Sequence, residues 1–158
     1  MADDDEADLS VQERLARLTT APSGPTSLLG LPAGQTAAFC YVPVPPIDFL
    51  VPVLILATEP RKGAMYVRFH AFQALLLSLA GAAGLVVLLV SSDLLDLLAT
   101  LGGGAFRPLL GPLSSLSVLL AGPFLAFVVV IELVAMWRCW QGGTLVLPYI
   151  GPVAAGMA

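Results

Sequence analysis

Charge is scarce in this sequence. Only 11% of its 158 residues are charged and 58% are hydrophobic, whereas soluble domains carry roughly 25% charged residues. A chain with so few charges cannot cover a surface that faces water. The composition therefore predicts an integral membrane protein whose main partner is the lipid bilayer.

Several functional signatures are also missing. There is no basic stripe with interleaved aromatic residues, which argues against nucleic-acid binding. There is no HExxH, no GxSxG and no phosphate-binding loop, so the sequence predicts no catalytic residues, no metal site and no cofactor. The N-terminus has no basic stretch followed by an apolar core, so we do not expect a signal peptide.

Cysteine is rare as well. Cys40 and Cys139 stand far apart, with no CxxC pair and no Cys/His cluster. This spacing argues against a disulfide framework and against a zinc site. We expect the two residues on opposite sides of the membrane. They would then be too far apart for a disulfide, which needs Cα atoms within about 7 Å.

The first 35 residues form a region distinct from the apolar remainder. Met1–Asp8 is acidic and is expected to be disordered, because nothing in it can be buried. Ser10–Glu13 has a capping-box pattern and predicts a short amphipathic helix over Val11–Leu18, with a frayed turn as the alternative. Thr19–Gly34 is a linker rich in Pro, Gly, Ser and Thr. A membrane domain is expected over residues 36–153, followed by a C-terminal tail over residues 154–158. The stretch Gln141–Ala158 is expected to lie at the cytoplasmic surface.

The first apolar segment, Thr36–Thr58, is interrupted by four prolines, which predicts a broken helix. Pro46 suits the first position of its second half. Asp48 would lie near the positive end of that helix, as a cap or as a residue lining a polar cavity. The segment is expected to cross the membrane, and the alternative is that it re-enters on the same side.

Two further segments are long enough to cross. Val67–Val90 carries no charge after its first turn and exceeds the roughly 20 residues that a crossing needs. Ala80 and Gly84 form a small-xxx-small pair that lets another helix approach closely. The third crossing is expected over Leu113–Trp137.

The region between these segments is amphipathic. Asp93, Asp96 and Thr100 share one helical face, which predicts a short interfacial helix lying in the membrane plane. The fold class is thus an all-α membrane protein with three transmembrane helices and short amphipathic interfacial helices.

Basic residues set the expected orientation. Arg61, Lys62 and Arg68 flank two membrane segments, so the loop 59–66 is predicted to be cytoplasmic. The C-terminus is then cytoplasmic and the N-terminus outside. If the first segment re-enters, the N-terminus moves inside and the rest is unchanged.

Three short sequence segments resemble those of a known family: Ala38–Pro43, Tyr66–Ala74 and Gly142–Ile150. Together they resemble small bacterial membrane proteins of unassigned function that are related to the twenty-kilodalton Tic subunit of chloroplast protein import. The resemblance covers about Ala38 to Val153. It implies a multi-helix protein of the bacterial inner (plasma) membrane, with no agreed activity for the bacterial members.

Ionisable and polar residues at membrane depth are candidates for function. The candidate intramembrane polar cluster is Arg68, His70, Gln73 and Glu132. Glu132 is expected to pair with Arg68 or His70, either to fix helix packing or as a proton- or substrate-sensing site. Gln73 and Ser78 are expected to form hydrogen bonds between helices rather than to bind ligands.

The resulting functional prediction is a non-enzymatic, Tic-related membrane component. It would assist a protein or solute translocation assembly through contacts with partner membrane proteins or with copies of itself. The alternative is an oligomeric transporter or channel subunit, since three helices alone scarcely enclose a pore.

Overall fold

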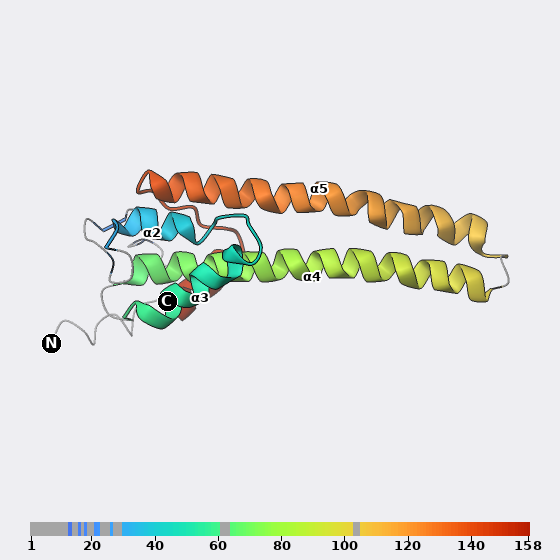
Figure 1. The fold of residues 1–158 in the computed structure, drawn as a ribbon, viewed down its shortest axis with the longest axis horizontal. Coiled ribbons are helices and arrows are strands. Elements are labelled where there is room, and N and C mark those ends of the chain that lie inside the picture. Colours follow the sequence, from blue (N-terminus) through green and yellow to red (C-terminus); the bar gives the residue numbers. More distant parts are fainter. Residues whose placement is uncertain are drawn as a thin grey trace. The chain divides into compact units, whose positions relative to one another are not determined.

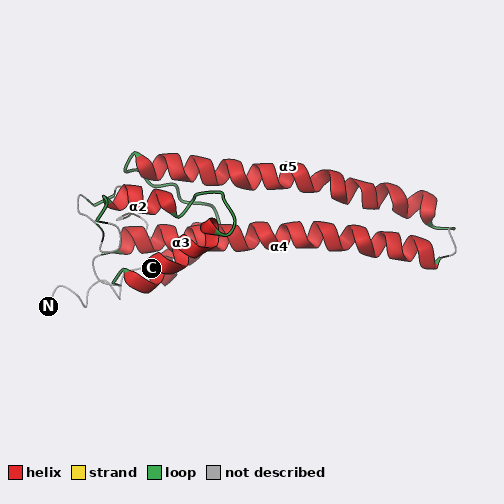
Figure 2. Ribbon diagram, viewed as in Figure 1, coloured by secondary structure: helices red, strands yellow, loops and turns green. Residues whose placement is uncertain are grey.

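The computed structural model describes five helices with defined bounds and no strand within the described residues (Figure 2). The described part comprises residues 30–60, 64–102 and 105–158, together with positions 13, 16, 18, 21, 22 and 26. The predicted all-α fold is confirmed there. The acidic tail, most of the Val11–Leu18 helix, Arg61 and Lys62 lie outside the described residues.

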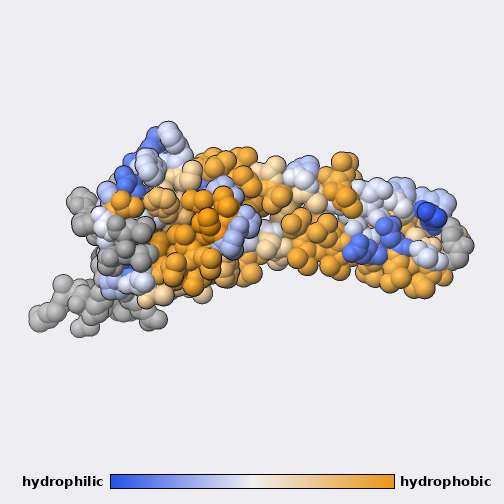
Figure 3. All heavy atoms as spheres, viewed as in Figure 1, coloured by the Kyte–Doolittle hydropathy of each residue, from blue (hydrophilic) through white to orange (hydrophobic). Residues whose placement is uncertain are grey.

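Two helices are long and apolar enough to cross a membrane: α4 (Met65–Leu101) and α5 (Arg107–Trp140). Only 17% and 11% of their most apolar windows are buried inside the structure, whereas the core helix of a soluble protein would be mostly buried. Figure 3 shows the hydrophobic side chains exposed along them. Exposed apolar surface of this kind is typical of an interaction surface for protein or lipid, so both helices are candidate membrane spans.

Both helices are longer than the sequence suggested. α4 has 37 residues and α5 has 34, or about 55 and 51 Å at 1.5 Å per residue. The separate interfacial helix expected after Val90 is absent, because α4 continues through this region to Leu101. The Ser91 and Thr100 hydroxyls donate to carbonyl oxygens of the preceding turn, so these polar residues are satisfied without ending the helix.

The first apolar segment is broken, as predicted. It forms α2 (Ala33–Phe39) and α3 (Ile47–Thr58), and Pro46 is the N-cap residue of α3. Their 7 and 12 residues are fewer than the roughly 20 of a crossing helix. The third spanning helix is therefore not among the described elements.

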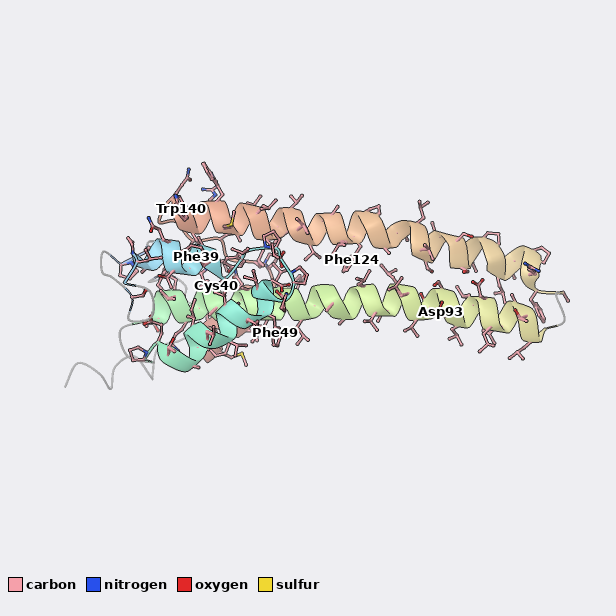
Figure 4. The ribbon with its side chains drawn as sticks, viewed as in Figure 1. Phe39, Cys40, Phe49, Asp93, Phe124 and Trp140 are labelled. Carbon is pink, nitrogen blue, oxygen red and sulfur yellow. The ribbon has the colours of Figure 1, made fainter. Side chains whose placement is uncertain are left out.

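The chain divides into two compact units, which we describe separately. The unit formed by residues 79–130 contains the C-terminal part of α4, which packs against the N-terminal part of α5. A Cβ atom on Gly84 would overlap the ring of Phe124, a residue labelled in Figure 4. The small-residue patch thus does admit a neighbouring helix closely, and that helix is α5 of the same chain.

The other unit, here called the core unit, contains residues up to Ser78 and from Ile131 onward. In it α2 begins beside the end of α5, where a Cβ on Gly34 would lie 2.6 Å from the Cys139 carbonyl oxygen. α3 begins at the level of Ser78, which donates to the Asp48 carbonyl, and ends beside Arg68. Both ends of the α2–α3 hairpin therefore lie at the end of the core unit where α4 begins (Figure 1).

The C-terminal residues also pack into the core unit. They form α6 (Ile150–Met157), in which Ala154 and Ala155 are buried. Gly151 lies against the Gln73 side chain. The surface tail expected at residues 154–158 is instead part of a helix that completes the core, so the domain boundary at 153 divides a structural element.

Candidate functional site

A buried polar network fills the centre of the core unit. Tyr66, His70 and Gln73 lie three and four residues apart on α4, so they share one helical face. The His70 side chain is completely buried. Its Nδ1 lies 3.0 Å from the Tyr41 hydroxyl, and the Cys139 sulfur lies 3.5 Å from the same nitrogen.

Gln73 joins three segments of the chain. Its Nε2 donates to the Tyr41 hydroxyl at 2.9 Å and to the Leu145 carbonyl at 2.7 Å. Its Oε1 accepts from the Leu147 N–H at 3.2 Å. Because the Tyr41 oxygen accepts from Gln73, its own proton is available to donate to His70. The network therefore ties α4 to the α2–α3 turn and to the segment after α5.

Tyr66 extends this tie to the end of α5. Its hydroxyl donates to the Gly143 carbonyl at 2.6 Å, and its ring contacts His70 edge-on. Burial raises the pKa of the Tyr41 hydroxyl and of the Cys40 thiol, which both lie in the turn after α2. Both groups therefore stay neutral and act as hydrogen-bonding groups rather than as nucleophiles.

Arg68 stands apart from this network. Its guanidinium donates to the carbonyl oxygens of Leu56 and Glu59 at 3.1 and 3.0 Å, and it lies 5.7 Å from the Phe72 ring centroid. These carbonyls are at the C-terminus of α3, the negative end of that helix. Arg68 thus holds the end of the α2–α3 hairpin against α4.

Glu132 does not pair with Arg68 or His70, so that prediction is wrong. In this antiparallel arrangement Cys139 lies opposite His70. Glu132 precedes Cys139 by seven residues on α5. Because the two helices are antiparallel, it lies level with Leu77, which follows His70 by seven residues on α4. Glu132 is therefore about 10 Å from the level of His70 along the helix axis.

Asp48 lies in the first turn of α3, as predicted, but α3 has no side-chain cap hydrogen bond. Its backbone oxygen accepts from the Ser78 hydroxyl at 3.4 Å. The predicted four-residue cluster is therefore not one group. His70 and Gln73 meet at Tyr41, Arg68 bonds to the end of α3, and Glu132 lies further along α5.

Both cysteines lie in the core unit. Cys40 and Cys139 belong to one buried cluster and are free thiols. The prediction that they lie on opposite sides of the membrane is wrong, because the α2–α3 hairpin brings Cys40 to the same end of the core unit as the end of α5. Ser78 forms the expected hydrogen bond between helices, to the Asp48 carbonyl of α3. Gln73 bonds instead to Tyr41, Leu145 and Leu147, which lie in the segments that connect the helices.

Sequence reasoning missed the two tyrosines of the network. Tyr41 and Tyr66 lie within the segments Ala38–Pro43 and Tyr66–Ala74. A buried phenol in an apolar segment needs a hydrogen-bond partner, and this requirement could have pointed to both tyrosines as members of a polar network. Within the described ranges, no three histidine, cysteine, aspartate or glutamate residues come together to hold a metal ion.

The fold and this site define a class: an all-helical chain with two candidate membrane-spanning helices and a buried, mutually hydrogen-bonded polar network. No protein-family model, curated protein or solved structure matches the chain.

Proposed function

We propose that this chain is a non-enzymatic component of a protein or solute translocation assembly in the bacterial inner membrane, related to the Tic-type proteins that its motifs resemble. It would act as a rigid set of helices that offers its outer surface to partner membrane proteins or to further copies of itself.

The closed hydrogen bonding of the core network carries this proposal. Tyr41, His70 and Gln73 are buried and bond to one another or to backbone groups of the same chain. A translocation path needs polar groups that are free to bind what passes. These side chains are instead committed to holding the α2–α3 hairpin and the C-terminal segment on α4, which suits a structural component.

The proposed topology has two crossings, α4 and α5, with the α2–α3 hairpin re-entering from the cytoplasmic side. Non-helical backbone at membrane depth is tolerated where protein covers it, and buried Tyr41 lies in the turn that joins the two short helices. Both chain ends then lie in the cytoplasm with the loop 59–66. The alternative with a third crossing over Thr36–Thr58 would place the N-terminus outside.

One observation favours the alternative of an oligomeric transporter or channel subunit. Glu132 is a carboxyl group in the core unit that is only 5% exposed, and carboxyl groups at membrane depth often mark ion pathways.

Photo-crosslinking along α5 tests the assembly role. A photoreactive residue is placed in turn at Leu116, Leu119, Leu120 and Val130, which are exposed and apolar; Leu119 is 70% exposed. In intact membranes, a packed partner gives protein adducts at positions that recur with the helical period, and the adducts are identified by mass spectrometry. Adducts with lipid alone at all four positions, together with solute flux in liposomes that contain only this protein, would reject the proposal in favour of the transporter.

A further inference from the structure

The C-terminal end of α5 exposes an aromatic and basic surface that the assembly role does not explain. Trp137 and Trp140 are 62% and 53% exposed, and Arg138 and Gln141 are exposed beside them. Cys139, in the middle of this stretch, is fully buried in the core unit. Helical geometry therefore turns the other four side chains away from the core. Trp140 is labelled at this end of α5 in Figure 4.

The end of α5 does not need the Arg138 side chain. The Arg138 carbonyl accepts from the Gly143 N–H at 3.0 Å, and the Cys139 carbonyl accepts from the Gly142 N–H at 2.9 Å. Backbone groups thus close the last turn, with Gly142 at a φ of 76°. Within the described residues, no hydrogen bond or ion pair engages the Arg138 guanidinium, so its N–H donors are available to an anion.

This surface lies where the apolar span ends. The candidate span of α5 stops at Trp140. Cys139 lies opposite His70, and Arg68 precedes His70 by two residues on α4, or about 3 Å along the axis. Arg68 bonds to carbonyls of the α3 end, whereas Arg138 faces outward. Tryptophan is enriched at the boundary between hydrocarbon and headgroups, because its ring is apolar and its N–H is a donor.

We propose that Trp137, Arg138 and Trp140 form a binding site for the phosphate group of an anionic lipid. The planar guanidinium binds the phosphate through paired N–H···O hydrogen bonds, and the two indole rings hold it at headgroup depth. A lipid fits this site because a bilayer places negative phosphates at the level where the apolar span ends. The site is independent of the proposed assembly role, since lipid occupies it whether or not a partner protein covers the rest of α5.

Intrinsic fluorescence reports on the site without a label, because Trp137 and Trp140 are the only tryptophans in the chain. Purified protein is placed in vesicles of equal parts phosphatidylcholine and phosphatidylglycerol, with one of the two lipids brominated at a time. Bromine quenches tryptophan fluorescence on contact. We expect stronger quenching by brominated phosphatidylglycerol, equivalent to about fivefold tighter binding, which is the contribution of one basic residue at an anionic membrane surface.

Two variants and a depth measurement make the result specific. Arg138→Gln removes the charge and keeps a polar side chain, so the two brominated lipids should quench equally. Arg107→Gln is the matched control, because Arg107 is an exposed arginine at the other end of α5, and the preference should stay about fivefold. Bromine near the glycerol end of the acyl chains should quench more than bromine near their methyl end, as an interfacial position requires.

Several results would overturn the proposal. Equal quenching by the two brominated lipids in the unchanged protein would show that no anionic headgroup is selected, and a preference that survives Arg138→Gln would place the selection elsewhere. Stronger quenching by deep bromine would remove the tryptophans from the headgroup region. Loss of the preference in inorganic phosphate, but not in chloride of equal ionic strength, would make this a site for free phosphate. These outcomes leave the crosslinking test of assembly unaffected.

Discussion

At the scale of single residues, environment decided the roles of the polar groups. His70 and Gln73 use their hydrogen-bonding capacity inside the chain, and Arg68 interacts with a helix end. In an apolar medium an unpaired polar group is expensive, which is why these buried side chains are hydrogen-bonded.

Gln73 provides the first test at this scale. Gln73→Leu removes three hydrogen bonds and leaves the Leu145 carbonyl and the Leu147 N–H unsatisfied. We expect the free energy of unfolding in detergent to fall by about 2 kcal/mol, since hydrogen bonds between membrane segments contribute roughly 0.6 kcal/mol each and orphaned buried groups add to the loss.

The matched control for this prediction is Gln141→Leu. Gln141 is exposed just after α5, so its replacement is expected to change stability by no more than about 0.5 kcal/mol. Equal losses in the two variants, measured by denaturant titration, would show that the network contributes nothing specific.

At the scale of elements, close backbone approach positions the α2–α3 hairpin. Gly34 sits in the second position of α2, against the Cys139 carbonyl oxygen at the end of α5. Prolines end one short helix and begin the next, and Arg68 holds the far end of α3. The hairpin is thus fixed at its entry and at its exit.

Gly34→Ala tests this close contact. The new Cβ would lie 2.6 Å from a backbone oxygen, so α2 must shift, and overpacking of this kind costs about 1–3 kcal/mol. Cys40 should then react with a maleimide faster than in the unchanged protein, because displacement of α2 exposes its buried thiol.

Gly156→Ala is the control, because nothing lies within 4 Å of a Cβ at that helical position. Alanine there should stabilise the protein slightly, since it favours helix over glycine by up to about 1 kcal/mol. If Gly34→Ala were neutral or stabilising, α2 would not be packed on α5 as described.

At the scale of the whole molecule, the central prediction concerns topology. With two crossings, a fluorescent protein that matures only in the cytoplasm should be fluorescent when fused before Met1 or after Ala158. Alkaline phosphatase inserted between Gly102 and Ala105, in the connection from α4 to α5, should be active outside. Activity of a phosphatase fused before Met1 would instead establish a third crossing over residues 36–58.

The sequence by itself determined which segments are helical and apolar. Composition indicated lipid as the solvent, and prolines set the break between α2 and α3, with the start of α3 placed within one residue. These features follow from local chemistry: backbone restriction by proline, and the apolar length needed to cross a bilayer.

Only the tertiary structure decided which polar groups meet. The sequence grouped Arg68, His70, Gln73 and Glu132 by their apparent depth. The register of α5 against α4 moved Glu132 about two helical turns deeper than His70, and the α2–α3 hairpin brought in Tyr41 and Asp48. Register and hairpin direction arise from packing between distant segments, which no local pattern in the sequence specifies.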